Sequence, residues 1–147
     1  MKRLKWLLFI YACLMYPTPG LALGATQVII ITQYAETAIA AEVALSRSEQ
    51  ETGLMHRASL AENHGMLFPL PYPRPMRMWM KDTLIPLDML FIDEQKRIIY
   101  LKENATPKSL AAIGPGKNII AVLELPGGTI QKLRIAVGDT VRYRLAE

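Results

Sequence analysis

Cysteine and histidine are scarce in this chain of 147 residues, which contains one cysteine and two histidines. The cysteine, Cys13, lies in the N-terminal segment, so residues 25–147 contain no disulfide, no thiol nucleophile and no thiolate metal ligand. The histidines, His56 and His64, have no recognised metal-binding spacing. Nucleophile-elbow, metal-hydrolase and phosphate-loop motifs are also absent. The sequence therefore predicts no catalytic residue, no metal site and no cofactor.

The N-terminal segment has the pattern of a secretory signal peptide. Three basic residues within the first five positions precede an apolar run at residues 6–16, and small residues before Ala25 fit a cleavage site. The apolar run is too short to span a bilayer, which needs about 20 residues. A retained membrane anchor is the alternative. We expect residues 1–24 to be removed and the protein to be exported to the periplasm or the extracellular space, with no stable membrane span.

Basic charge is low outside this leader. The whole chain has 17 Lys and Arg against 13 Asp and Glu, for a net charge of +4. Three of the basic residues and none of the acids lie in the leader, so residues 25–147 have 14 against 13 and a net charge of +1. This balance predicts no nucleic-acid partner. Because no repeat or low-complexity boundary interrupts them, residues 25–147 are expected to form a single domain.

Short apolar and β-branched runs separated by turn residues predict a mainly β protein. The expected strands are residues 27–32, 38–45, 65–70, 76–81, 87–92, 97–103, 119–125 and 140–144. Two short helices are expected, one after a capping box at Ser46–Glu49 that ends near Gly53, and one capped by Thr129. Alternating prolines in residues 69–75 predict an exposed, extended rim loop. Without crossover helices, we expect a small antiparallel sandwich or barrel of jelly-roll type with about eight strands.

The stretch Met76–Asp93 contains the only tryptophan beyond the leader, Trp79. Residues 76–81 alternate between methionine and other residue types. Three methionines therefore face one side, and Arg77, Trp79 and Lys81 face the other. Two interpretations are open: core methionines under a solvated outer face, or an outer face that forms the wall of a binding groove. An aromatic side chain between two cations can stack on a sugar ring while the cations hold hydroxyls or an anion.

Two carboxylates, Asp88 and Glu124, lie within apolar runs that are expected to be buried strands. A buried carboxylate must be paired, hydrogen-bonded or protonated, because burying a bare charge is very unfavourable. One interpretation is that Asp88 stabilises the fold by accepting hydrogen bonds. The donors would be backbone N–H groups, or Lys81 or Thr83 across the bend expected between residues 76–81 and the strand at residues 87–92. Alternatively, Asp88 is a functional carboxylate with a perturbed pKa.

Several segments of the chain form a recognisable set. They are Gly53-Leu54-Met55-x-Arg57, Gly65-Met66-Leu67-Phe68, Trp79-Met80-Lys81-Asp82-Thr83-x-x-Pro86-Leu87-Asp88-x-x-Phe91-Ile92, Val122-Leu123-Glu124-Leu125-x-Gly127 and Gly138-Asp139. The set resembles the DUF192 (UPF0127) family over roughly residues 38–144. The resemblance implies a small, mainly β, single domain of a family that is often exported and has no known function.

The resemblance also places individual residues at signature positions, although it does not assign them roles. The signature residues with polar or aromatic side chains are Arg57, Trp79, Lys81, Asp88 and Glu124. Those expected to have a structural role are Gly53, Met55, Gly65, Pro86 and Glu124. The chain departs from the family pattern at Asp82, where Asn is usual, so an amide contact becomes a possible charge pair with Lys81.

The hypothesis that we favour is a non-catalytic binding module for a glycan or another small polar ligand. Its candidate ligand-binding residues are Arg57, Trp79, Lys81 and Asp88. In this constellation Asp88 orients Lys81, and Trp79 offers a stacking face.

Three alternatives remain open. A structural or accessory protein would bind another envelope protein through residues 69–75 or a sheet edge. A hydrolase would use a carboxylate pair drawn from Asp88, Glu103 and Glu124. A Cu(I) site would use methionine thioethers and would need ligands from a second segment, because alternate residues of one strand lie about 7 Å apart.

Overall fold

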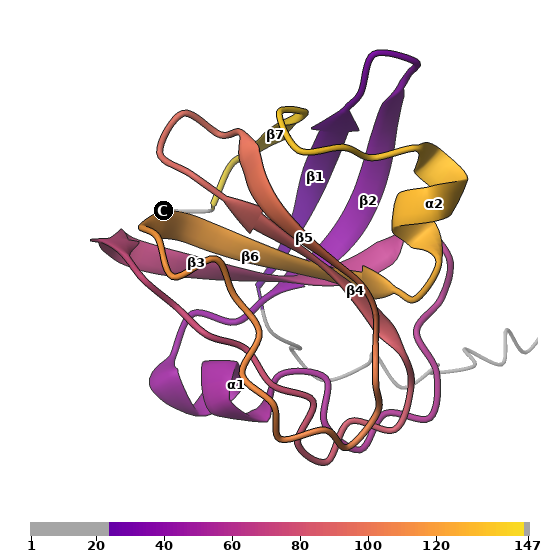
Figure 1. Cartoon of the computed structure of the whole chain (residues 1–147), viewed down its shortest axis with the longest axis vertical. Coiled ribbons are helices and arrows are strands. Elements are labelled where there is room, and N and C mark those ends of the chain that lie inside the picture. The colour runs from indigo at the N-terminus through magenta and orange to yellow at the C-terminus, as the bar shows by residue number, and fades with distance from the viewer. Residues whose placement is uncertain (1–23, 146–147) are drawn as a thin grey trace, which may run out of the picture.

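The structure, a computed structural model, describes residues 24–145 and contains seven strands and two short helices (Figure 1). The elements are β1 (Ala25–Ile31), β2 (Glu36–Val43), α1 (Arg47–Thr52), β3 (His64–Arg74), β4 (Leu87–Ile92), β5 (Ile98–Ala105), β6 (Ile119–Pro126), α2 (Thr129–Leu133) and β7 (Thr140–Tyr143). All seven strands belong to one mixed sheet in the order β5-β4-β6-β3-β2-β1-β7. Apart from Gly24, the predicted leader lies outside the described residues.

This topology corrects the expected eight-stranded antiparallel jelly roll in two respects. First, β2 and β3 are parallel, because α1 and the segment after it carry the chain back across the sheet. Second, residues 76–81 are not a sheet strand. Among the described residues they form one isolated β-bridge, between Met78 and Ile113, and Lys81 already lies in a turn.

The sheet is curled around a first hydrophobic core to which every strand contributes at least one buried side chain. Its members include Val28, Ile30, Ile39, Leu67, Leu90, Ile98, Leu123, Ile130 and Val141. The two edge strands meet at one corner, where Arg97 bridges Thr140 and the Val141 N–H donates to the Lys96 carbonyl at 2.8 Å. The contact is confined to this corner, so the sheet does not close into a complete barrel.

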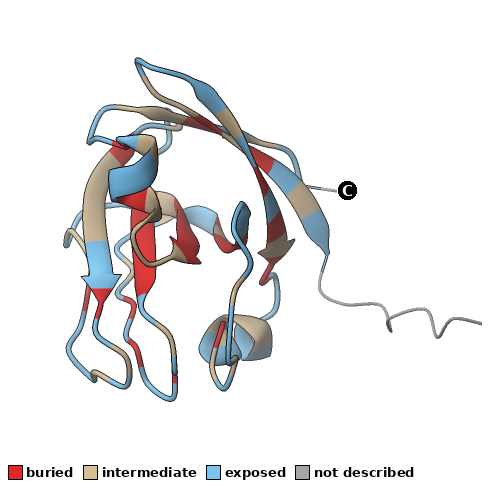
Figure 2. Ribbon diagram, turned by 90° about the vertical axis from the view of Figure 1, so that its right-hand side faces the viewer, coloured by how far each residue is buried: buried red, intermediate tan, exposed pale blue. Residues whose placement is uncertain are grey.

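A second core lies on the opposite face of β3, β6 and β4, under α1 and the long loops. These loops gather with α1 at the lower end of the molecule (Figure 1), and Figure 2 shows buried residues along the strands above them. The core includes Met66, Phe68, Met89 and Val122 from the sheet, and Leu54, Met78, Met80 and Ile113 from the loops. The predicted alternation is confirmed: Met78 and Met80 are buried, while Arg77, Trp79 and Lys81 are exposed.

The two helices begin differently. The predicted capping box of α1 is confirmed, because Ser46 Oγ accepts a hydrogen bond from the Glu49 N–H and the Glu49 carboxylate accepts one from the Ser46 N–H. The second predicted helix, α2, is present, but its predicted cap was wrong. Its N-cap is Gly128, which has no side chain to cap the helix, and the Thr129 hydroxyl instead donates to the Pro126 carbonyl at 2.6 Å.

The proline-rich segment is also more regular than the predicted rim loop, because β3 continues through it to Arg74. β3 pairs with β2 only from His64 to Leu67, so beyond that point no strand within residues 24–145 pairs with the edge that faces away from β6. The Pro69 carbonyl points to this free edge, where it accepts a hydrogen bond from Gln50 Nε2 at 2.9 Å. A proline is tolerated there because the missing N–H has no strand to pair with.

Gly65 lies on β3 where a larger residue would contact the backbone of β6. A Cβ atom at this position would lie 2.5 Å from the Glu124 carbonyl oxygen and 3.1 Å from Leu125 Cδ2. We expect Gly65→Ala to lower the free energy of unfolding by about 1–3 kcal/mol, because a backbone oxygen within a ladder cannot move aside. Val137→Ala, which shortens an exposed side chain, is the control for urea denaturation. Equal midpoints for the two variants would contradict the prediction.

Candidate functional site

Asp88 is fully buried on the first-core side of β4 and accepts two backbone hydrogen bonds. Its Oδ1 accepts from the Asn104 N–H at 2.8 Å, and its Oδ2 accepts from the Ile130 N–H at 2.7 Å. The second bond satisfies a donor in the first turn of α2, whose own N-cap, Gly128, has no capping side chain. A carboxylate at a helix N-terminus is also favoured by the helix dipole. Asp88 therefore joins β4, β5 and α2.

These contacts correct the predicted constellation of four residues. Asp88 does not orient Lys81, because its carboxylate oxygens bond to Asn104 and Ile130 instead. Trp79 and Lys81 do lie together, with Lys81 Nζ at 5.4 Å from the centroid of the Trp79 ring.

Arg57 pairs with a residue that the sequence analysis did not single out. Its two terminal nitrogens donate to the two oxygens of Glu42 at 2.5 and 2.6 Å, a bidentate ion pair that joins the turn after α1 to β2. The hydrogen bonds from Arg57 lower the pKa of Glu42, against the opposing effect of burial. This ion pair connects the turn that carries Met55 to β2, so Arg57 has a structural role in positioning that turn.

The carboxylate pair that a hydrolase would need is not formed by Asp88 and Glu124. In the register of β4 and β6, Asp88 faces Leu125, and Met89 faces Glu124. Because directly paired residues point to the same side of a sheet and neighbouring residues to opposite sides, the two carboxylates lie on opposite faces. Glu103, the third candidate, is exposed on β5.

Signature segments that are distant in the sequence instead converge on a narrow pocket beside the second core. Its volume is about 20 Å³, which is room for one water molecule, since a water needs about 10–15 Å³. The lining residues are Gln50, Glu51, Thr52, Gly53, Leu54, Met55, Phe68, Met78, Trp79, Thr83 and Glu124. The pocket is thus enclosed by the end of α1, the turn after it, β3, β6 and the Trp79 loop.

Glu124 supplies the buried carboxyl group of this pocket. It is only 4% exposed, and burial raises its pKa to about 8. Within residues 24–145, no hydrogen bond between protein groups reaches its side-chain oxygens. A carboxyl group with this pKa is mostly protonated at neutral pH, so it can donate one hydrogen bond and accept others.

Trp79 lies at the boundary between this pocket and a second, wider hollow. The second hollow has a volume of about 280 Å³ and is lined by Arg77, Met78, Trp79, Leu110 and Ala112. Trp79 is 48% exposed, although it is a large apolar side chain. Sequence reasoning missed Leu110, which belongs to an irregular segment. Its proximity to Trp79 follows from the bridge between Met78 and Ile113, for which the sequence offers no signal.

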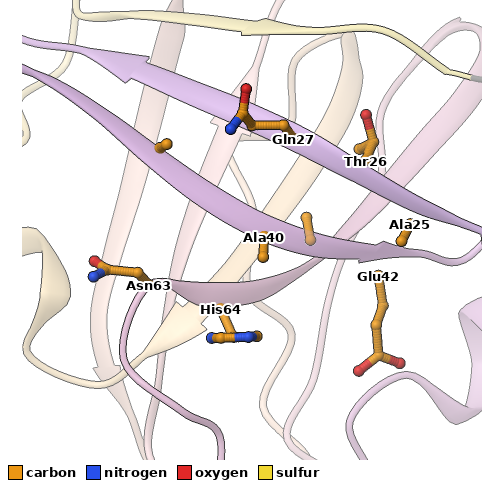
Figure 3. A pocket seen from close by; sticks show the side chains of 9 residues that line it. Ala25, Thr26, Gln27, Ala40, Glu42, Asn63 and His64 are labelled. Carbon is orange, nitrogen blue, oxygen red and sulfur yellow. The ribbon is translucent and has the colours of Figure 1, made fainter. Parts of the chain in front are cut away.

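A wider hollow lies elsewhere, on the surface of β1, β2 and the start of β3 (Figure 3). Its volume is about 650 Å³, and four of its nine lining residues are alanines. Its one carboxylate, Glu42, is already neutralised by Arg57. We therefore place the candidate site at the Trp79 and Glu124 pocket, which has an unpartnered buried acid and an exposed aromatic side chain.

The signature glycines and proline shape the loops around the site. Gly53 has a φ of +47°, and a Cβ atom there would lie 3.2 Å from Phe68 Cζ. The Pro86 carbonyl accepts a hydrogen bond from the Gly127 N–H at 3.0 Å, which joins the end of the Trp79 loop to the turn after β6. These residues act through the backbone and do not offer polar side chains to a ligand.

Metal-binding groups are dispersed. Within residues 24–145, no group of three or more His, Cys, Asp and Glu side chains could share an ion. The Cu(I) hypothesis required a second segment beside the methionine row, and Met55 does line the same pocket as Met78. Met80, however, is fully buried in the second core.

No helix in the described part of the chain is both long and apolar enough to span a membrane.

Asp88→Ala should lower the free energy of unfolding by about 1–3 kcal/mol, because two buried N–H groups lose their acceptor. Glu103→Ala removes an exposed carboxylate from the neighbouring strand and is the control. Chemical denaturation of both variants measures the difference. A change within experimental error for Asp88→Ala would show that these hydrogen bonds contribute nothing to stability.

Glu124 should make stability depend on pH. Between its unfolded pKa near 4.5 and its folded pKa of about 8, the folded state keeps a proton that the unfolded state has released. The contribution of Glu124 to stability should therefore be fully present below pH 4.5 and fall as pH rises towards 8, by at most about 1.4 kcal/mol per pH unit. Glu124→Gln should remove this contribution. The measurement is urea denaturation of both proteins from pH 5 to 9, and parallel profiles would contradict the assignment.

Comparison with known proteins identifies a family. A model of the family DUF192, described as "Uncharacterized ACR", matches residues 29–143. A protein of Sinorhizobium meliloti 1021 with the provisional description of a transcription regulator has a similar crystal structure, with a TM-score of 0.81, 38% identity, and coverage of 85% of this chain and 98% of that one. A protein of unknown function from Novosphingobium aromaticivorans DSM 12444 has a TM-score of 0.80, 31% identity, and coverage of 86% and 89%. None of the curated proteins matches. The match over most of the chain shows that this protein belongs to the DUF192 family.

Proposed function

We propose that this protein is an exported, non-catalytic module that binds a glycan or another small polar ligand, with Trp79 as its stacking surface. The observation that carries the proposal is the exposure of Trp79 between Arg77 and Lys81, beside two hollows. An indole face can stack on the apolar face of a sugar ring, and flanking cations can donate hydrogen bonds to its oxygens.

The loop that carries Trp79 is held firmly at both ends. The Met78 and Ile113 backbones exchange two hydrogen bonds of 2.8 Å, and the Met80 N–H donates to the Ser109 carbonyl at 2.9 Å. Buried Met78 and Met80 anchor the inner side of the same segment. A surface aromatic residue that is ordered before binding loses little conformational entropy when a ligand arrives, which favours affinity.

A second candidate is an accessory protein that binds another envelope protein. The observation that favours it is the exposure of Leu84 and Leu110 as well as Trp79, at 45%, 68% and 48%. Their loops are joined by a hydrogen bond from the Lys108 N–H to the Thr83 carbonyl. Exposed apolar side chains that lie together are typical of protein-binding surfaces.

The description of the Sinorhizobium meliloti relative would suggest nucleic-acid binding for this chain as well. The charge balance does not support that extension. Residues 25–147 have a net charge of +1, and proteins that bind nucleic acids present a concentrated basic surface to the phosphates.

The test is a thermal-shift screen of residues 25–147 against glycans and small polar metabolites. A ligand at about 100 times its dissociation constant adds roughly 2.7 kcal/mol, which should raise the melting midpoint by several degrees. Trp79→Ala should abolish the shift. Tyr72→Ala removes another exposed aromatic side chain, 63% exposed on β3, and should leave the shift intact.

Intrinsic fluorescence provides an independent readout, because Trp79 is the only tryptophan in residues 25–147. A ligand that stacks on the indole should change its emission. Emission that stays constant across the whole panel, or a thermal shift that survives Trp79→Ala, would overturn the proposal. Constant emission together with capture of an envelope protein that Leu110→Asp prevents would favour the accessory-protein candidate.

A further inference from the structure

The buried acid Glu124 and the exposed Trp79 line the same narrow pocket. On its own strand, Glu124 points to the side of the second core, with Met66 directly across on β3 and Met89 directly across on β4. Both neighbours are fully buried and uncharged. A carboxyl group in these surroundings gains no hydrogen bond from the sheet, so the pocket is the direction in which a partner can reach it.

The charged groups around the pocket do not compensate Glu124. Glu51 on α1 is the other ionisable side chain in the lining, and it is ion-paired with Arg47 at 2.7 Å on the exposed side of the helix. The remaining segments contribute uncharged residues, among them Thr83 and Phe68. Lys81 and Arg77 lie on the exposed outer side of the Trp79 loop.

We propose that Glu124 holds one uncharged hydroxyl group of the ligand that stacks on Trp79, so that the site selects polyols and sugars over amines and carboxylates. This inference rests on the proposed function and names the ligand class of the same site. A hydroxyl both donates and accepts hydrogen bonds, and a protonated carboxyl group offers the complementary donor and acceptor. A pocket with room for one water molecule admits such a group in place of the water.

Other small polar groups fit this pocket less well. A ligand carboxylate would bring a second acid against Glu124 and would have to be desolvated to enter. An ammonium group would require Glu124 to ionise in apolar surroundings, which burial disfavours. Discrimination is strong when a buried polar group depends on the ligand for its hydrogen bonds, since a ligand without the matching group leaves it unpaired.

The test uses small probes and methionine methyl groups labelled with carbon-13 in residues 25–147. Met55 and Met78 line the pocket, and Met66 and Met89 lie directly across from Glu124 on the neighbouring strands, so all four methyl groups report on the surroundings of Glu124. Methanol is the hydroxyl probe, and methylammonium chloride is the cationic probe of similar size. Each is titrated by NMR at pH 6.5 and pH 9.5 into the wild type, Glu124→Gln and Glu124→Leu.

We expect methanol to shift the Met55 and Met78 resonances in the wild type at pH 6.5, with an affinity at least tenfold lower at pH 9.5, where Glu124 has lost its proton. Glu124→Gln keeps an uncharged donor and acceptor, so the pH dependence should disappear. Glu124→Leu should lose the methanol response at both pH values. Methylammonium should produce weaker shifts than methanol at pH 6.5.

Three results would overturn the inference. They are a wild-type methanol response that is the same at both pH values, a methanol response that survives Glu124→Leu, and a stronger response to methylammonium than to methanol at pH 6.5. The first two need no assumption about the natural ligand. The wild-type pH comparison also stands if a variant fails to fold.

Failure of the hydroxyl pocket can be distinguished from failure of the proposed glycan-binding function. A glycan whose binding requires Trp79 but is unaffected by Glu124→Leu would keep the stacking site and overturn the role of Glu124. A pH-dependent methanol response in a protein that binds no glycan in the panel would keep the hydroxyl pocket and overturn the glycan proposal.

Discussion

The constraint on which the structure depends is that β6, the middle strand of the β3-β6-β4 ladder, is buried on both faces. Its side chains alternate between the two cores, so neither face can leave a polar group to water. Two acids in this ladder meet that constraint in different ways. Asp88 accepts backbone hydrogen bonds that hold α2 in place, whereas Glu124 keeps its proton. Asp88 therefore stabilises the fold, whereas Glu124 remains available to a ligand. The burial of the two side chains alone does not distinguish these roles.

The local pattern predicted a large part of this structure. Side-chain periodicity and capping chemistry act over a few residues. They predicted the buried strand at residues 87–92, the capping box of α1, and the alternation of buried and exposed side chains at residues 76–81. The segments that resemble DUF192 also predicted the family, and Trp79 and Glu124 were among their residues. These local patterns indicate which side of each segment is buried.

Apart from the cap of α2, the errors concern contacts between segments that are distant in the sequence. The parallel pairing of β2 with β3 depends on how the whole segment between them packs. The alternation of apolar and polar residues within either strand gives no information about this pairing. The same holds for Arg57, whose partner Glu42 lies 15 residues earlier, and for Asp88, whose second partner lies 42 residues later. The expected constellation was built from one stretch and one signature arginine, whereas the pocket draws on five parts of the chain.

The free edge of β3 has a consequence for how the protein behaves in a crowded compartment. An unpaired strand edge is a template on which a second chain can add a strand, and such additions start aggregation. Pro69 faces this edge without an N–H donor, and two more prolines follow at alternate positions within the strand. Pro69 therefore offers no N–H to an incoming strand, and its carbonyl is already occupied by Gln50. An incoming strand could not complete its ladder, so the segment resists self-association while remaining in regular extended structure.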